Sequence, residues 1–322
     1  MRVLVTGGAG FLGGHLLRGL VDAGRAAVSL DVNAAPDSVP GVEYLTGSLL
    51  DVDALAEAAT GCSAIVNAAA VSDFWAPGRF TFDRINVLGV CRVLAVARRL
   101  NARVVQVSSY TTLVARDASV GAMLDEQVEV LPSNLLGTYP RTKRQADLAL
   151  QSAAAAGVHA ASVLPGALIG PGDHRPTMPG KLMRDLVSGR LPAMMKSHLN
   201  LVDVRSVASA TIAAIDRAEP GERYLLTGED LMLSDLVSLI HDLGGVAPPR
   251  RTVPQRLALA AARVESILAS ATGRPPRAPL TGVRLASRDV HFSAAKAATK
   301  LDFHPTPIAD VVRDTMEWLS TQ

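Results

Sequence analysis

The chain opens with MRVLVTGGAGFLGG, residues 1–14, and this stretch decides the expected fold. Apolar and β-branched residues at 3–6 predict a short buried strand, the glycines within 7–10 predict a tight turn, and the apolar spacing over 11–20 predicts a helix. Such a turn directs the free N–H groups and the positive dipole end of the helix into one small space. The stretch therefore predicts a binding site for a pyrophosphate group.

The glycine spacing is Gly7-x-x-Gly10-x-x-Gly13, which differs from the tighter G-x-G-x-x-G pattern. Glycine is needed in such a turn because a Cβ would hold the phosphate away. A second predicted strand, 26–30, leads to Asp31, whose carboxylate can accept hydrogen bonds from the adenosine ribose hydroxyls. The two features together predict a dinucleotide site, and the alternative is a glycine turn without a ligand.

Asp31 also bears on which nicotinamide cofactor is used. A carboxylate at this position repels the additional phosphate of NADP, and no Arg or Lys lies between Asp31 and Gly41 to offset it. We therefore expect NAD. NADP stays open, because Asp31 could be an ordinary loop residue and Arg25 could fold back toward a phosphate.

The composition is that of a globular protein. The 322 residues are 48% apolar and 19% charged, which suffices for one large α/β domain with a small appended lobe. A net charge of +2 without a long basic run does not indicate binding of nucleic acid. No apolar run reaches the length of a membrane span, and Met1 leads directly into the first strand, which leaves no room for a signal peptide. We expect a cytoplasmic protein without stable membrane insertion.

The cysteines point to a reducing compartment. Cys62 and Cys91 are too few for a disulfide framework and lack the spacing of metal ligands. We expect both to be buried thiols and predict no metal site.

Strands and helices alternate through the first half of the chain, as in a doubly wound parallel sheet. We expect an α/β fold of the Rossmann type, with a dinucleotide-binding domain over 1–165, to which later segments return. A smaller substrate-binding lobe with terminal helices is expected over 166–322. The further predicted strands are 42–45, 64–67, 103–107 and 160–164, and the helices between them are 51–59, 82–100 and 138–156.

In such a sheet the ligand lies across the carboxyl ends of the strands, where three segments carry chemistry. The first segment holds the small residues Ala68, Ala69 and Ala70, which let the ribose and pyrophosphate lie against backbone. The second, Ser108 to Thr112, begins with two serines. The third, 165–172, is rich in proline and glycine, and we expect it to be an irregular loop that can close on the nicotinamide.

Tyr139 and Lys143 lie four residues apart on a predicted helix and so share a face. A nearby ammonium favours the phenolate, so we expect the pKa of Tyr139 to be lowered toward the range useful for proton transfer. Tyr139 would then exchange a proton with the substrate. A serine hydroxyl would hold the substrate oxygen in line; we assign this role to Ser109, with Ser108 and Thr111 as fallbacks.

These residues resemble one family over essentially the whole chain: the extended short-chain dehydrogenase/reductases of the NAD-dependent epimerase/dehydratase superfamily. The resemblance includes the opening over 6–13, the Ser-Tyr-Lys set and Asn86-Val87-Leu88-Gly89. It implies that Asn86 helps to organise the active site. Asn86 could equally be an ordinary polar residue of the helix. The chain is most similar to the branch of 3β-hydroxysteroid dehydrogenases, dihydroflavonol reductases and hopanoid-associated sugar epimerases, through segments 74–77, 169–173, 189–193 and 199–204.

The resemblance also implies a set of cofactor contacts along the strand ends. The expected set is Gly7, Gly10, Phe11, Leu12, Gly13, Asp31, Ser48, Leu49, Ala68, Ala69, Ala70, Ser108, Tyr139, Lys143, Pro165, Ala167 and Leu168.

The chain departs from the family pattern at several positions. Ser48 stands where an Asp near the adenine is usual, and Arg205-Ser206 replaces an acidic residue. Gly166 and Ala167 occupy the stretch where sugar-nucleotide enzymes carry an Asn. Tyr110-Thr111 stands in place of the Asp-Glu pair of the sugar dehydratases, which argues against dehydration. For a nucleotide diphosphate, Arg184 and Arg190 could serve, or could be surface residues.

The second half is expected to supply the substrate side. We predict a helix over 177–190 and, over 191–195, an apolar pocket-lining segment, in which Met194 and Met195 are alternatively plain core. An apolar helix over 254–272 could cap the pocket, lie on a membrane surface or pack on the body; we favour packing or capping. Segments 292–296 and 307–319 resemble the terminal helices of the family.

The leading functional hypothesis is hydride transfer between the nicotinamide and a secondary alcohol or ketone, with Lys143 binding the nicotinamide ribose. Nucleotide-sugar epimerisation by transient hydride transfer is the alternative, and a non-catalytic dinucleotide sensor is a third reading. We expect a small, apolar substrate. Family resemblance implies a homodimer formed through the helices 82–100 and 138–156.

Overall fold

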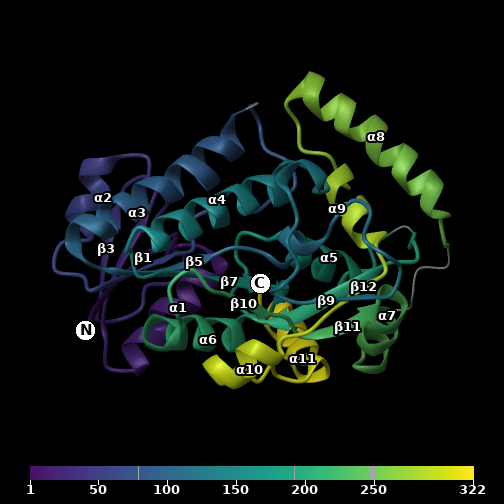
Figure 1. The fold of residues 1–322 in the computed structure, drawn as a ribbon. Helices are drawn as coiled ribbons and strands as arrows, with labels where there is room; N and C mark the ends of the chain where they lie inside the picture. Colours follow the sequence, from purple (N-terminus) through teal and green to yellow (C-terminus); the bar gives the residue numbers. More distant parts are fainter. Residues whose placement is uncertain (79, 192, 247–250) are drawn as a thin grey trace.

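A parallel sheet of seven strands runs through the protein, in the order β10-β7-β5-β4-β1-β2-β3 (Figure 1). This computed structural model describes residues 1–78, 80–191, 193–246 and 251–322. The doubly wound sheet expected from the sequence is confirmed, and β10 joins it from beyond residue 165. The strands are β1 Arg2–Thr6, β2 Ala26–Asp31, β3 Val42–Thr46, β4 Ala64–Asn67, β5 Arg103–Val107, β7 Ala160–Pro165 and β10 Arg223–Leu226.

Helices cover both faces of this sheet (Figure 1). Val3 and Val5 pack in one core with α1 and α6, whereas Leu4 packs in a second core with α2, α3 and α4. Both faces of β1 are therefore buried, which is why its sequence is continuously apolar instead of alternating. These helices are α1 Phe11–Asp22, α2 Val52–Ala58, α3 Gly89–Leu100, α4 Thr138–Ala155 and α6 Val204–Arg217, with α10 Ala295–Leu301 beside α6.

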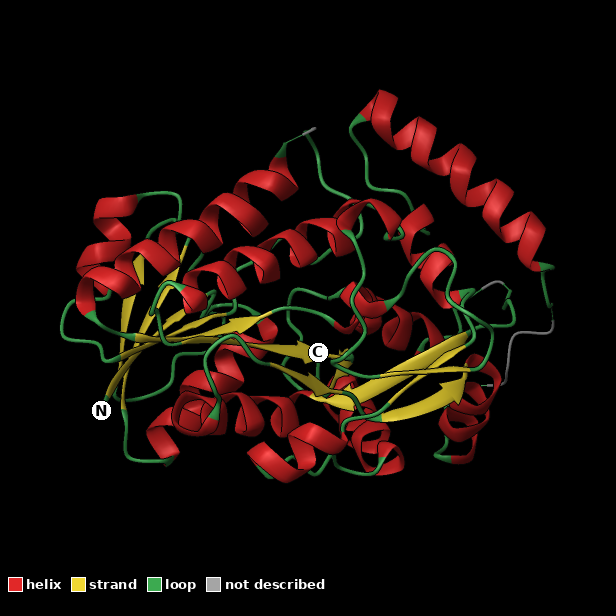
Figure 2. Cartoon of the chain, in the orientation of Figure 1, coloured by secondary structure: helices red, strands yellow, loops and turns green. Residues whose placement is uncertain are grey.

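A lobe with two small sheets lies beside the large one (Figure 2). One sheet has the order β11-β9-β8, and the other pairs β12 with β6. The strands are β6 Ala122–Leu124, β8 Ala167–Ile169, β9 His198–Asp203, β11 Glu229–Met232 and β12 Val290–Phe292. The helices are α5 Met178–Val187, α7 Leu233–Asp242, α8 Gln255–Thr272, α9 Leu280–Ala286 and α11 Ile308–Ser320.

Two segments expected to lack strands contain them. The segment 165–172 is not irregular throughout, because Ala167–Ile169 form β8 and pair in parallel with β9. Phe292 ends strand β12, which pairs with β6, so only the part of 292–296 from Ala295 on is helical. Each of these strands has three residues and depends on a partner distant in sequence, so local pattern could not reveal it.

Three further expectations need correction. Cys62 is buried as expected, but Cys91 is exposed, because the buried side of α3 is formed by other residues. The helix expected over 82–100 begins with π-helical geometry, η1 Asp83–Leu88, before α3. Helix α5 ends at Val187 instead of continuing to 190. Pro192, in the expected pocket segment, lies outside the described residues.

Among the residues that the structure describes, no helix has the length and apolar character needed to cross a membrane.

Candidate active site

The turn after β1 contains glycines that internal packing requires and one that leaves open space. Gly7 has φ +75°, and a Cβ there would lie 2.7 Å from the Ala69 nitrogen; a Cβ on Gly13 would lie 2.0 Å from the Gly7 carbonyl oxygen. These two glycines are needed for internal packing. Gly10 is exposed, and a Cβ on it would approach only the Gly7 carbonyl oxygen, at 3.1 Å. Gly10 therefore leaves open space in front of the helix, as a glycine that lets a pyrophosphate approach must.

The N-terminus of α1 faces this space without a side-chain cap. Gly10 is the N-cap residue, and among the residues that the structure describes no side chain caps the first turn, which begins with Phe11 and Leu12. Uncapped N–H groups and the positive end of the helix dipole favour an anion. The open cradle at Gly10 and these free donors fit the diphosphate of a dinucleotide.

Asp31, at the end of β2, lies beside the same turn. Its carboxylate accepts hydrogen bonds from the Ala9 N–H at 3.1 Å and the Asn33 N–H at 2.9 Å. Arg25 does not fold back toward it, since Arg25 pairs with Asp216 at 2.5 Å. The sequence missed one cation: Arg175, from the loop after β8, donates to the Ala34 carbonyl at 3.0 Å.

The remaining expected cofactor contacts follow the strands of the large sheet and its neighbour β8. The Ser48 hydroxyl accepts from the Leu50 N–H at 3.1 Å. Leu49 is buried, and its Cδ1 would lie 1.8 Å from a Cβ on Gly89, so Leu49 packs closely on the start of α3. The Ala68 N–H donates to Thr6. Ala69 and Ala70 follow in the loop, Pro165 ends β7, and Ala167 and Leu168 lie in β8.

Tyr139, Ser109 and Thr111 meet beside one cavity. Tyr139 lies in the first turn of α4, and its ring packs edge-on against Phe74 at 5.5 Å between ring centroids. The Ser109 hydroxyl bonds to Thr111 Oγ1 at 2.9 Å, and it also hydrogen-bonds to Tyr139, which favours the phenolate. The structure thus brings a phenol and a serine hydroxyl to one side of the cavity.

Burial dominates the titration of the Tyr139 and Lys143 pair. It raises the pKa of Tyr139 to about 12 and lowers the pKa of Lys143 to about 8. The Lys143 ammonium donates to the Val107 carbonyl at 2.8 Å. The expectation of a lowered Tyr139 pKa is therefore wrong, because desolvation of the phenolate outweighs the hydrogen bond from Ser109, and the Asp147 charge also raises this pKa.

Asp147 is a buried site residue that sequence reasoning missed. It lies one helical turn beyond Lys143 on α4, and its Oδ2 accepts a hydrogen bond from Ser108 Oγ at 2.7 Å. Burial raises the pKa of Asp147 to about 6, and the Lys143, Arg144 and Arg223 charges oppose this shift. The Ser108 hydroxyl is thus engaged by Asp147, whereas Ser109 lines the cavity. The i, i+4, i+8 spacing of Tyr139, Lys143 and Asp147 was the available signal.

Asn86 ties two parts of the site together. Its side-chain amide accepts from the Val71 N–H at 2.9 Å and donates to the Val71 carbonyl at 3.1 Å. It also donates to Thr142 Oγ1 at 3.3 Å, next to Lys143 on α4. Asn86 therefore fixes the loop after β4 to the helix that carries Tyr139 and Lys143.

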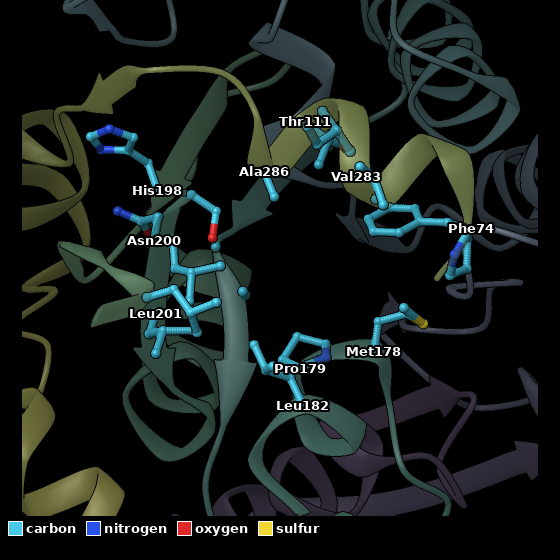
Figure 3. Close-up of a pocket in the computed structure, with 18 of the residues that line it drawn as sticks. Phe74, Thr111, Met178, Pro179, Leu182, His198, Asn200, Leu201, Val283 and Ala286 are labelled. Carbon is cyan, nitrogen blue, oxygen red and sulfur yellow. The ribbon is translucent and has the colours of Figure 1, made fainter. Parts of the chain in front are cut away.

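The cavity has a volume of about 450 Å³ and lies between the carboxyl ends of the large sheet's strands and the lobe. Figure 3 shows Phe74 and Val283 across it from Pro179 and Leu182, with His198 and Asn200 at one end. Most of its lining side chains are apolar. They include Phe74, Val114, Leu168, Met178, Pro179, Leu182, Leu191, Met194, Met195, Leu199, Leu201, Leu233, Val283, Leu285, Val290 and Phe292.

The residues expected on the substrate side divide between the cavity and the surface. Met194 and Met195 both line the cavity. Arg184 instead lies over the Trp318 ring at 5.9 Å, and Arg190 pairs with Asp185 at 3.5 Å on the surface. Neither arginine lines the cavity. Its lining does contain Arg277 and Arg288, which pattern alone did not identify.

The chain is similar to several known proteins over almost its whole length. The chain is 30% identical to a Synechocystis sp. protein named after dihydroflavonol 4-reductase, over 98% of this chain and 93% of the relative. It is 28% identical to sterol demethylase protein B of Methylococcus capsulatus, over 99% and 98% of the two chains. The solved structure of gox2253 is similar, with a TM-score of 0.83 and 30% identity, covering 99% of this chain and 98% of that one.

Residues 3–226 match the model of the family described as NAD dependent epimerase/dehydratase family. This match spans more than half of the chain and includes the glycine turn, Asp31, Ser109, Tyr139 and Lys143. The chain therefore belongs to the NAD-dependent epimerase/dehydratase family.

Proposed function

We propose that this protein is an NAD-dependent dehydrogenase or reductase that acts on a secondary alcohol or its ketone. The observation that carries the proposal is the meeting of Tyr139 and Ser109 at the wall of an apolar cavity, in a chain that also carries the open glycine turn after β1. When bound, the nicotinamide accepts or supplies the hydride at the substrate carbon.

The chain's own residues handle the proton and the position of the substrate oxygen. Tyr139 exchanges the hydroxyl proton, and Ser109 donates a hydrogen bond that holds the same oxygen in line. Lys143, held in place by the Val107 carbonyl, binds the nicotinamide ribose. A positively charged ring near Tyr139 would favour the phenolate and bring its pKa down from the high value that burial imposes.

The proposed selectivity is for NAD over NADP. Asp31 lies beside the glycine turn with its carboxylate already accepting two backbone N–H groups, and a phosphate there would be repelled. Arg25 is paired with Asp216, so it is not held ready for that phosphate.

The lining of the cavity supports an apolar substrate over a nucleotide sugar. Gly166 stands where sugar-nucleotide enzymes carry an asparagine, and the lining side chains are mostly apolar. Arg184 and Arg190 lie outside the cavity, so the arginines available to a diphosphate there are Arg277 and Arg288. The similarity to a sterol demethylase protein supports the same substrate class. Nucleotide-sugar epimerisation stays the alternative.

The experiment that tests the proposal compares phenylalanine variants of two tyrosines that line the same cavity, Tyr139 and Tyr110. Tyr139→Phe removes the proposed acid/base, and Tyr110→Phe removes the phenol that also lines the cavity and packs on Phe292 at 5.1 Å. We expect Tyr139→Phe to lower kcat by about 10²- to 10⁴-fold while NAD still binds. Tyr110→Phe should retain most of the activity. Equal losses in the two variants, or full activity of Tyr139→Phe, would overturn the assignment.

A further inference from the structure

Helix α8 turns an apolar face to the outside of the protein. It stands at the edge of the molecule and packs most closely against α9 (Figures 1 and 2). Ala262 and Ala269 are its buried residues. On the opposite face, the exposed fractions are 61% for Leu257, 57% for Val264, 69% for Ile267 and 57% for Leu268. An ordinary surface helix buries such residues and exposes its polar ones. Helix α8 has the reverse pattern, with large apolar side chains exposed to solvent.

The exposed apolar residues form one continuous stripe. Leu257, Val264 and Leu268 repeat at i, i+7 and i+11, which places them on one face of a helix. Ile267 lies beside Val264 on that face. Alanines fill the gaps between them: Ala260, Ala261 and Ala271 are all exposed.

The charges around this stripe are basic. Segment 251–277 contains five arginines and a single acidic residue, Glu265. Glu265 is engaged, since its carboxylate accepts from the Ala278 N–H at 3.1 Å. Within the described parts of the chain, none of the five arginines forms an ion pair. They are Arg251, Arg256, Arg263, Arg274 and Arg277.

Both ends of α8 connect to the wall of the cavity. Before the helix, the Arg251 carbonyl accepts from the Met194 N–H at 2.9 Å, and Met194 lines the cavity. After the helix, Arg277 and Ala278 are exposed and also line the cavity. The cavity therefore reaches the surface next to the apolar stripe.

We infer that α8 docks the protein onto an anionic lipid surface, with its apolar stripe in the headgroup boundary and its arginines on the lipid phosphates. An apolar face with flanking arginines and almost no acidic charge is what such a surface selects. A second copy of the chain would bring the same unpaired arginines together, which disfavours it as the occupant. In this orientation, the mouth of the apolar cavity lies beside the lipid surface.

Vesicle co-sedimentation of the full chain tests this inference without any measurement of activity. We expect binding to vesicles of phosphatidylcholine with phosphatidylglycerol, and much weaker binding to phosphatidylcholine alone. Val264→Glu with Ile267→Glu should weaken binding at least about tenfold. Arg256→Ala and Arg263→Ala should each weaken binding to the anionic vesicles by about fivefold. The matched control is Val120→Glu, at an 84% exposed valine that is not part of α8, and it should bind as the parent does.

Three results would overturn the inference: a parent chain that stays in the supernatant with every vesicle, a Val120→Glu variant as impaired as the α8 variant, or an α8 variant that splits a dimer without changing vesicle binding. Because the readout is lipid binding, failure here leaves the proposed hydride transfer untouched, and failure of that reaction leaves this result standing.

Discussion

At the residue scale, the buried row of Tyr139, Lys143 and Asp147 on α4 defines the chemistry of the site. The sequence predicted the Tyr–Lys pair because four-residue spacing on a helix implies a shared face. The same spacing extends to Asp147, but the burial that raises the pKa of this carboxyl depends on tertiary packing and could not be predicted from the sequence. The direction of the Tyr139 pKa shift was wrong for a similar reason: the desolvation that raises this pKa depends on tertiary packing.

The buried Lys143 predicts a pH dependence of stability. Its pKa is 10.5 in the unfolded chain and about 8 in the folded protein, so between these pH values the unfolded state binds more protons. The contribution of Lys143 to the free energy of unfolding therefore rises from pH 8 to pH 10.5, by up to about 3 kcal/mol. Denaturant unfolding of the parent and of Lys143→Met across this window measures the difference. A difference that stays flat or falls with pH would contradict the assigned shift.

At the element scale, the glycine turn and the loop after β7 show what local pattern can and cannot predict. The turn was predictable because strand, glycines and helix are adjacent in sequence. Strand β8 was not, since its three residues pair with β9 about thirty residues further along the chain. Likewise, Asn86 reads as any polar helix residue until its bonds to Val71 and Thr142 are seen.

The two kinds of glycine in the turn predict two kinds of variant. Gly13→Ala places a Cβ 2.0 Å from the Gly7 carbonyl oxygen, and we expect it to lower the free energy of unfolding by about 1–3 kcal/mol or more. Gly10→Ala meets only one atom, at 3.1 Å, so the protein should stay folded while its affinity for NAD falls at least about tenfold. Thermal unfolding and NAD titration measure both effects.

Gly14→Ala is the matched control for this pair, because a Cβ there meets nothing within 4 Å. It should change neither stability nor affinity appreciably. Unaltered NAD affinity in Gly10→Ala would contradict the assignment of the open turn to the pyrophosphate.

Asn86 gives a second prediction at this scale. Asn86→Ala leaves the Val71 N–H and carbonyl without their partner, which costs about 1–3 kcal/mol of the free energy of unfolding. Because Asn86 also contacts Thr142 on α4, we expect kcat to fall further than NAD affinity does. Thr142→Ser, which keeps a hydroxyl for Asn86, serves as the control. A loss of stability with kcat unchanged would reduce Asn86 to a structural role.

At the scale of the whole molecule, the cavity joins residues from Ser72 to Phe292, and no sequence window contains more than a part of it. Local pattern therefore predicted the large sheet and the cofactor side well, but not which arginines lie in the cavity. The fold could be predicted because inner strands of that sheet such as β1, β4 and β7 are buried on both faces and read as largely apolar runs, whereas the edge strand β3 is only partly buried.

The predicted homodimer is also a property at this scale. Leu88, at the end of η1, is 45% exposed, and Leu148 on α4 is 38% exposed, on the two helical segments expected to pair. We expect Leu88→Asp with Leu148→Asp to convert a dimer into a monomer in sedimentation experiments. Leu131→Asp, at a 72% exposed leucine in another part of the chain, should leave the dimer intact. A parent chain that is monomeric at all concentrations would refute the dimer.

The most direct test of the central claim is the absorbance of reduced nicotinamide when the protein, supplied with NAD, is offered hydroxysteroids, other secondary alcohols and UDP-sugars in turn. The proposed function predicts net reduction of NAD with at least one apolar alcohol and none with the sugars. No net reduction with any alcohol, together with an isomerised sugar in a UDP-sugar reaction, would contradict it and establish that the hydride returns to its substrate.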